Sequence, residues 1–90
     1  MDFEWDDNKA AYNFQKHGVS FQEASSVFYD FLSSTFADPD HSEAEDRFII
    51  IGQSSQGRVL FVSHTDRGAR IRIISARPLG PKERRLYAAE

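Results

Sequence analysis

The pattern of hydrophobic and polar positions predicts a short strand followed by a helix at the start of the chain. Phe3-Glu4-Trp5 alternates as a short strand does. Asp6 or Asp7 then suits the N-cap of a helix, because a carboxylate there accepts hydrogen bonds from the free amides of the first turn. The helical pattern continues to Lys16-His17, and Gly18 provides the left-handed residue that ends a helix.

A second helix is predicted from Ser20 onward. Ser20-Phe21-Gln22-Glu23 has the form of a capping box, in which a serine and a glutamate satisfy the first amides of a helix. Phe21, Ala24, Phe28 and Phe31 follow at helical spacing and predict one buried stripe.

The second part of the chain is rich in β-branched residues. The runs 47–52 and 58–63 are joined by a turn with Gly57, which predicts an antiparallel hairpin. A third run, 70–75, extends this hairpin into a meander. We therefore expect strands to dominate from Arg47 onward.

Two shorter elements complete the predicted order β-α-α-β-β-β-β-α. Residues 34–37 favour a short strand, and residues 82–88 a C-terminal helix that begins near Pro81. This order predicts an α+β fold, with the helices packed on one side of an antiparallel sheet.

Composition indicates a small globular protein. The 90 residues are 40% hydrophobic and 13% aromatic, which is enough for one core, and we expect a single domain over residues 1–90. The absence of cysteine excludes disulfides, thiolate zinc sites and cysteine nucleophiles, and it suits the cytoplasm. No apolar run exceeds four residues, so we expect neither a membrane span nor a signal peptide.

The two halves of the chain carry opposite charge. Residues 1–46 hold eleven acidic residues and two lysines, a net charge of −9, whereas residues 47–90 have a net charge of +6. Such asymmetry is typical of a polyanion-binding surface, although the two halves could also pair with each other. Arginine outnumbers lysine eight to one in the second half, which favours bidentate contacts with phosphate.

The predicted strand from Arg70 to Arg77 carries the most informative charges. Alternation places Arg70 and Arg72 on one face. Two adjacent guanidinium groups repel unless an anion lies between them, so this pair is either a phosphate clamp or a solvated face with acidic neighbours. Strict alternation puts Arg77 on the opposite face, unless Pro78 redirects it.

The remaining polar residues favour chemistry without a cofactor. The three histidines have no zinc-ligand neighbours, and the segment 38–49 lacks the glycine and glutamate of a calcium loop. We therefore predict no metal and no cofactor. Cleavage of RNA needs neither, because the ribose 2′-hydroxyl is an internal nucleophile. A base, cations on the phosphate and a proton donor suffice.

Several segments also occur together in the order typical of a known family. They are Phe3-Glu4-Trp5-Asp6, Lys16-His17-Gly18-Val19-Ser20-Phe21 and Ile71-Arg72-Ile73-Ile74-Ser75-Ala76-Arg77, with Lys9, Asn13, Glu45 and Arg47 between them. On these residues the chain resembles the BrnT family of bacterial type II toxins. The resemblance implies a RelE-like fold, an endoribonuclease that inhibits translation, and a ribbon-helix-helix antitoxin. Operator DNA would be bound only through the toxin–antitoxin complex.

The resemblance marks candidate site residues by position. The matching residues are Lys9, Lys16, His17, Glu45, Arg47, Arg72 and Arg77. We expect Arg72 and Arg77 to stabilise the phosphorane, and Glu45 or His17 to take the 2′-proton, although His17 could instead only cap its helix.

The other cations are expected to hold substrate phosphates. They are Lys9, Lys16, Arg47 and Arg70, of which Arg70 is chosen from strand geometry alone. The alternative is a non-catalytic module that binds RNA, a ribosome or only its antitoxin. For the antitoxin we expect docking over the cationic strand 70–77, and the competing mode is a grip on the acidic residues 1–46.

Overall fold

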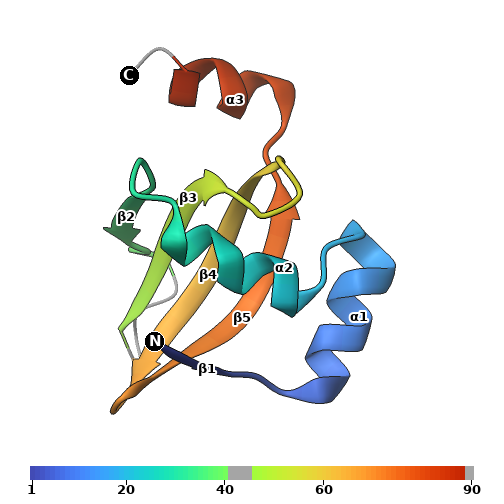
Figure 1. The fold of residues 1–90 in the computed structure, drawn as a ribbon, viewed down its shortest axis with the longest axis vertical. Helices are drawn as coiled ribbons and strands as arrows, with labels where there is room; N and C mark the ends of the chain where they lie inside the picture. The colour runs from blue at the N-terminus through green and yellow to red at the C-terminus, as the bar shows by residue number, and fades with distance from the viewer. Residues whose placement is uncertain (41–45, 89–90) are drawn as a thin grey trace.

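The computed structural model describes residues 1–40 and 46–88 and confirms the predicted order of elements. Within these residues, five strands form one sheet in the order β1-β5-β4-β3-β2 (Figure 1). The strands are β1 (Asp2–Glu4), β2 (Ser34–Ala37), β3 (Arg47–Gln53), β4 (Val59–Arg67) and β5 (Arg70–Pro78). The helices are α1 (Asp7–His17), α2 (Phe21–Ser26) with the 3-10 turn η1 (Val27–Tyr29), and α3 (Pro81–Ala88).

The sheet is mixed, whereas the sequence predicts an antiparallel one. Strands β2 to β5 pair antiparallel in sequence order, but β1 pairs with β5 in parallel, with Phe3 opposite Ile71. A hairpin turn forces its two strands to be antiparallel. β1 has no such turn, since α1 and α2 follow it, and its direction therefore depends on tertiary packing.

The helices divide between two places. α2 and η1 cross one face of the sheet and α1 lies beside β5, whereas α3 extends beyond the end of the sheet (Figure 1). The prediction that all helices pack on one side is therefore wrong for α3. The core between α2 and the sheet contains Val19, Phe21, Ala24, Val27, Ile50, Leu60, Val62, Ile73 and Ala76. Among the described helices, none is long and apolar enough to cross a membrane.

The ends of α1 are those that the sequence predicts. The Asp6 carboxylate accepts hydrogen bonds from the N–H groups of Asn8 and Lys9, at 2.8 and 3.1 Å. At the other end, Gly18 has a φ of 70° and its N–H donates to the Phe14 carbonyl at 2.8 Å. Both caps satisfy backbone groups that a helix leaves free.

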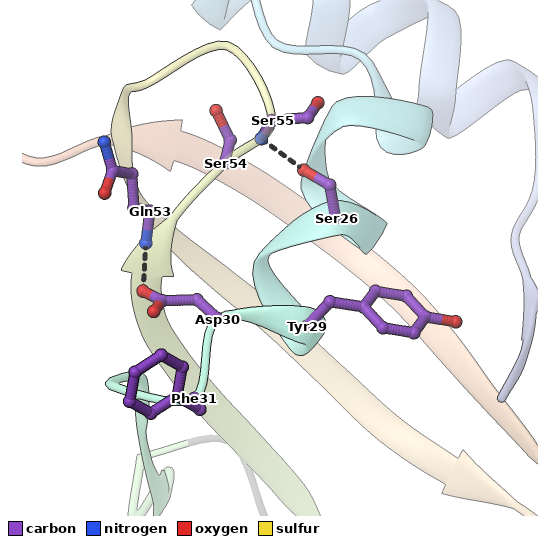
Figure 2. A pocket seen from close by; sticks show the side chains of 7 residues that line it. All are labelled: Ser26, Tyr29, Asp30, Phe31, Gln53, Ser54 and Ser55. Carbon is purple, nitrogen blue, oxygen red and sulfur yellow. Dashed lines mark hydrogen bonds between the residues drawn. The ribbon is translucent and has the colours of Figure 1, made fainter.

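The second helix is shorter than its apolar stripe predicts. Ser20 accepts a hydrogen bond from the Glu23 N–H at 3.0 Å, but the α-helix ends after six residues and continues as the 3-10 turn η1. Asp30 ends this turn, because its carboxylate accepts a hydrogen bond from the Gln53 N–H of β3 at 2.7 Å (Figure 2). Phe31 therefore leaves the predicted stripe and is 92% exposed.

A bulge in β5 decides which face its arginines occupy. Ser63 lies opposite Ser75, but the next residue of β4 lies opposite Ile73, so Ile74 is an extra residue. One extra residue reverses the alternation beyond it. Arg77 therefore shares the face of Arg72, and the bulge, rather than a following proline, is the cause.

His64 is buried on the helix-covered face of β4, among aromatic rings. Its ring centroid lies 4.7 Å from that of Phe28 and 6.0 Å from that of Phe48. Burial lowers the pKa of His64, because the protonated ring would lose its hydration. The Val62 carbonyl and Asp66 offset only part of this effect. The unfolded chain therefore binds a proton that the native chain excludes.

We expect the free energy of unfolding to fall as the pH decreases below 6.5, the ordinary pKa of histidine. Because only the unfolded His64 binds a proton in this range, the slope is at most about 1.4 kcal/mol per pH unit, down to the lowered native pKa. Urea unfolding between about pH 5 and 8 measures it. His64→Phe should flatten the slope and His17→Gln should not. Equal slopes in the wild type and His64→Phe would contradict the prediction.

Candidate functional site

A groove of about 460 Å³ lies between α1 and the second half of β5. Four of the predicted site residues line it: Lys9, Lys16 and His17 from α1, and Arg77 from β5. The structure thus brings together three cations and an imidazole from opposite ends of the chain. The cations can bind a phosphate, and an imidazole beside them is the side chain that most often serves as a general base.

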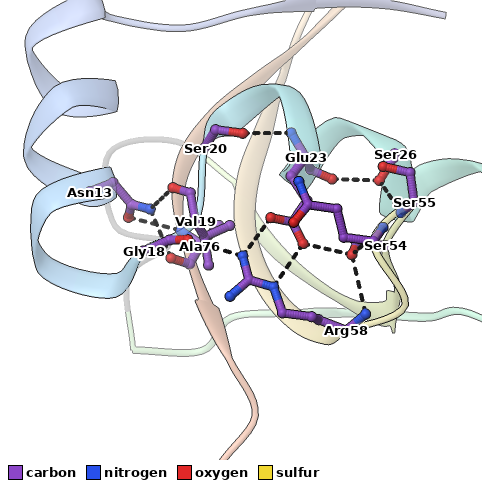
Figure 3. A network of polar contacts seen from close by, with 11 residues as sticks. Asn13, Gly18, Val19, Ser20, Glu23, Ser26, Ser54, Ser55, Arg58 and Ala76 are labelled. Atoms are coloured by element: carbon purple, nitrogen blue, oxygen red, sulfur yellow. Dashed lines mark hydrogen bonds and ion pairs between the residues drawn. The ribbon is translucent and has the colours of Figure 1, made fainter.

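Asn13 sets the distance between α1 and β5. Lys9 and Lys16 share one face of α1 because seven residues make two helical turns, and Asn13 lies between them, buried. Its Nδ2 donates to the Ala76 carbonyl at 2.8 Å and its Oδ1 accepts from the Ala76 N–H at 3.0 Å (Figure 3). The same Nδ2 donates to the Val19 carbonyl at 3.0 Å. The Asn13 amide thus takes the place of a neighbouring strand at this edge of β5.

Replacing Asn13 with alanine should loosen this junction. The change removes three hydrogen bonds and leaves the buried backbone of Ala76 unpaired, so we expect a loss of about 1–3 kcal/mol. Asn13→Asp is a matched control. It keeps an acceptor for the Ala76 N–H but turns a carboxylate toward two carbonyl oxygens, so it should be no more stable than Asn13→Ala. Thermal unfolding measures both, and an unchanged midpoint for Asn13→Ala would refute this role.

Arg77 is held on two sides. Its Nη1 and Nη2 donate to the Glu83 carboxylate of α3 at 2.8 and 2.9 Å, and its guanidinium lies 4.3 Å from the Phe61 ring centroid. Arg77 and the Gly80 N–H lower the pKa of Glu83 to about 2, so the pair is ionised at neutral pH. Glu83 contacts the end of the guanidinium, which leaves the donors on the Nε side for another acceptor.

Arg47 lies on the other side of Ser75. A second hollow, of about 290 Å³, is lined by Arg47, Phe61, Ser63 and Ser75, together with Asp38 and Asp40. Ser75 lines both this hollow and the groove at α1. Arg47 is therefore a neighbour of the groove on the sheet face opposite α2, where the predicted contact with a flanking phosphate is possible.

The structure does not bring Arg70 and Arg72 to the groove. Both lie at the start of β5 against Glu4 of β1, with Nη1 of Arg72 at 2.7 Å and Nη1 of Arg70 at 3.9 Å from its carboxylate. The anion between the two guanidinium groups is thus a carboxylate of the chain itself, which favours the acidic-neighbour interpretation over the phosphate clamp. Five residues of extended strand, roughly 16 Å, separate Arg72 from Arg77.

Glu45 lies outside the described residues, and its role as a base stays a prediction. The sequence assigned no role to three residues that shape the site: Asn13, Ser75 and Glu83. Each carries a weak signal in retrospect. Asn13 falls between two lysines at helical spacing, Ser75 interrupts an apolar strand, and Glu83 is the third residue after Gly80 at a helix start, where a glutamate often caps. Among the described residues, no three His, Asp or Glu side chains come together as metal ligands.

The fold and the groove define a class, a small α+β protein with a cationic surface suited to a polyanion. The model of a protein family, described as the ribonuclease toxin BrnT of type II toxin-antitoxin systems, matches residues 5–83. The chain belongs to this family. It follows that an antitoxin is its expected partner.

A solved structure agrees with this assignment. The crystal structure of the Brucella abortus ribonuclease toxin BrnT matches with a TM-score of 0.67 and 28% sequence identity, over 89% of this chain and 97% of that chain. A search of the curated proteins finds no match. The resemblance noted in the sequence and the α+β class are thus confirmed.

Proposed function

We propose that this toxin is an endoribonuclease that cleaves RNA in the cytoplasm without a metal ion and so inhibits translation. One observation carries the proposal: the groove that gathers Lys9, Lys16, His17 and Arg77. A metal-independent cleavage needs a proton acceptor and fixed cations around one phosphate, and these residue types supply both.

In this mechanism, His17 takes the proton of the ribose 2′-hydroxyl, and Glu45 is the other candidate for this step. The 2′-oxygen then bonds to the adjacent phosphorus. The bond from phosphorus to the 5′-oxygen breaks, and that oxygen receives a proton from an acid or from water. The products are a 2′,3′-cyclic phosphate and a 5′-hydroxyl end.

Arg77 stabilises the charge that develops on the phosphorane. Phe61 and Glu83 fix its guanidinium in place, so its Nε-side donors need no reorganisation as the phosphorane forms. Arg70 and Arg72 hold β1 through Glu4 in this proposal and contribute only positive charge.

The groove also offers a surface for an RNA base. Tyr12 lines it and is exposed, and the Lys16 Nζ lies 5.7 Å from the Tyr12 ring centroid. An exposed ring beside cations is typical of proteins that bind single strands, because bases stack on the ring while phosphates pair with the cations. Lys9 and Lys16 would hold the phosphates next to the cleaved one, with Arg47 beyond Ser75.

Incubation of a purified transcript with the free toxin in excess EDTA tests the proposal. We expect cleavage, with 2′,3′-cyclic phosphate ends on the products. Binding without cleavage would support the alternative, a non-catalytic module that binds RNA, a ribosome or only the antitoxin. Cleavage that requires added magnesium would also overturn the mechanism.

The expected antitoxin is of the ribbon-helix-helix type. We propose that it binds operator DNA only as part of the toxin–antitoxin complex, since the groove of this chain is assigned to RNA. Gel-shift experiments with operator DNA should therefore show no retardation by the toxin alone. Retardation by free toxin would contradict this assignment.

A further inference from the structure

The two edges of the sheet are protected to different degrees. At one edge, β1 carries the charges of Asp2 and Glu4, and the Asn13 side chain forms hydrogen bonds with the backbone of Ala76 in β5. The other edge strand, β2, reads Ser-Thr-Phe-Ala, all exposed, with no charge, proline or register shift. Proteins usually block an edge strand with one of these devices, because an open edge pairs with other chains. Within the described part of the chain β2 is the last strand of the sheet, so its outer side is available for pairing.

The register shows which backbone groups of β2 point outward. Asp38 follows β2 opposite Arg47, and its N–H donates to the Arg47 carbonyl at 2.9 Å. Antiparallel strands alternate between residue pairs that exchange hydrogen bonds and pairs that do not. Ser34 and Phe36 therefore face β3, whereas Thr35 turns its N–H and C=O groups away from the sheet. The same holds for residue 37.

Exposed apolar side chains continue along the same edge. Phe31 is 92% exposed, Leu32 69% and Phe36 45%. Figure 2 shows Phe31 and Tyr29 extending to opposite sides of the segment that carries Asp30, beside a hollow of about 440 Å³. We refer to residues 31–37 as the β2 edge. It combines open backbone groups with apolar side chains, as peptide-binding sheet edges do.

The charge around the β2 edge indicates the chemistry of its occupant. From residue 29 to residue 40 the chain contains three aspartates and neither lysine nor arginine. Asp30 precedes the edge, and Asp40 follows it and is exposed. A second copy of the chain would bring these acids against each other, whereas a segment with lysine or arginine would be attracted.

We propose that the β2 edge binds an extended segment of the antitoxin, one that alternates apolar with basic side chains and adds a strand beside β2. Its backbone pairs with Thr35 and Ala37, its apolar side chains contact Phe31 and Phe36, and its cations approach Asp40. That an antitoxin is the partner follows from family membership. The β2 edge lies at the opposite edge of the sheet from the groove between α1 and β5. The antitoxin segment is therefore anchored on the acidic residues 1–46, which is the docking mode that competes with docking over the cationic strand 70–77.

Amide exchange in the co-expressed toxin–antitoxin complex, measured residue by residue by NMR, tests the pairing. The N–H groups of Thr35 and Ala37 should exchange about tenfold or more slowly in the complex than in the free toxin. Those of Ser34 and Phe36, already bonded to β3, should change little. Protection confined to residues 70–77 would overturn the proposal and support docking over the cationic strand.

A proline substitution separates backbone pairing from side-chain contact. Thr35→Pro removes the outward N–H, a change that an edge strand tolerates, and Thr35→Val keeps it. We expect Thr35→Pro to weaken antitoxin binding by about tenfold or more, and Thr35→Val to leave it unchanged. Phe36→Ser is a second variant that should weaken binding without a proline. Equal affinity of the wild type, Thr35→Pro and Phe36→Ser would overturn the proposal.

Two further readouts identify the occupant and separate the two proposals. Sedimentation of the free toxin should show a monomer, and a dimer that Thr35→Pro abolishes would mean that a second copy occupies the edge. Thr35→Pro should cleave RNA as the wild type does but escape inhibition by the antitoxin. If the wild type cleaves no RNA, the catalytic proposal fails, while the exchange and affinity measurements still decide this one.

Discussion

Arg77→Ala should slow RNA cleavage by about 10²–10³, the usual effect of removing one fixed donor to a developing negative charge. Arg77→Lys should recover only part of the rate, because an ammonium group keeps the charge but cannot bind Glu83 and the phosphorane with two separate sets of donors. Single-turnover cleavage with saturating toxin measures the chemical step directly. Arg84→Ala, an exposed arginine on α3, is the matched control.

The stability of these variants decides between a catalytic and a structural role for Arg77. Its ion pair with Glu83 is more than a third exposed on both sides, and exposed pairs contribute at most about 1 kcal/mol. The unfolding midpoint of Arg77→Ala should therefore change little while its activity is lost. A wild-type rate for Arg77→Ala would refute the assignment. A loss of activity that parallels a large drop in the midpoint would show that Arg77 serves the fold instead.

The elements of this fold were predictable where the signal is local. Asp6 and Gly18 mark the ends of α1 because capping involves only the neighbouring residues. The hairpin of β3 and β4 follows from two β-branched runs and a glycine turn. The direction of β1 and the exposure of Phe31 were not predictable, because they depend on contacts with β5 and β3, far away in the sequence.

The site was predictable as a set of residue types and only partly as a constellation. Family motifs marked Lys9, His17 and Arg77, but the contact that brings α1 to β5 is made by Asn13, for which the sequence carried only a weak signal. Arg72 shows the reverse case. Its alternation with Arg70 indicated an anion between them, and only the pairing of β1 with β5 reveals that the anion is Glu4 of the chain itself.

A buried carboxylate, Glu23, ties three parts of the fold together (Figure 3). Its Oε2 accepts hydrogen bonds from the Ser54 hydroxyl at 2.7 Å and from Arg58 Nε at 3.0 Å, and Arg58 Nη2 also donates to the Gly18 carbonyl at 3.0 Å. The network joins α2 to the turn between β3 and β4 and to the end of α1. Arg58 lowers the pKa of Glu23 by hydrogen bonding to its ionised form, against the effect of burial. The sequence had assigned Glu23 to a capping box, but this network uses its side chain instead.

Arg58→Ala should be the most destabilising single change among the variants discussed. It leaves the Glu23 carboxylate, whose side chain is only 2% exposed, without a cation. Breaking a buried pair in this way costs about 3–5 kcal/mol. Because Arg58 is itself 37% exposed, and water can take part of its place, we expect the lower end of this range. For a small protein that is a large share of the total stability, about 5–15 kcal/mol.

Glu23→Gln provides the decisive comparison for this last prediction. Glutamine keeps an acceptor for Ser54 and removes the charge, so Arg58→Ala combined with Glu23→Gln should be more stable than Arg58→Ala alone.

The pH dependence of the stability that Glu23 provides has a definite sign. In the wild type the lowered pKa of Glu23 stabilises the fold above 4.5, its ordinary value, and this contribution is lost as the pH falls through the native pKa. In Arg58→Ala, burial alone favours the neutral acid. The difference in the free energy of unfolding between the wild type and Arg58→Ala should therefore shrink as the pH approaches 4.5. Urea unfolding of the four proteins at neutral and acidic pH measures both effects. A double variant no more stable than Arg58→Ala, with a difference independent of pH, would mean that the guanidinium acts only through Gly18 and packing.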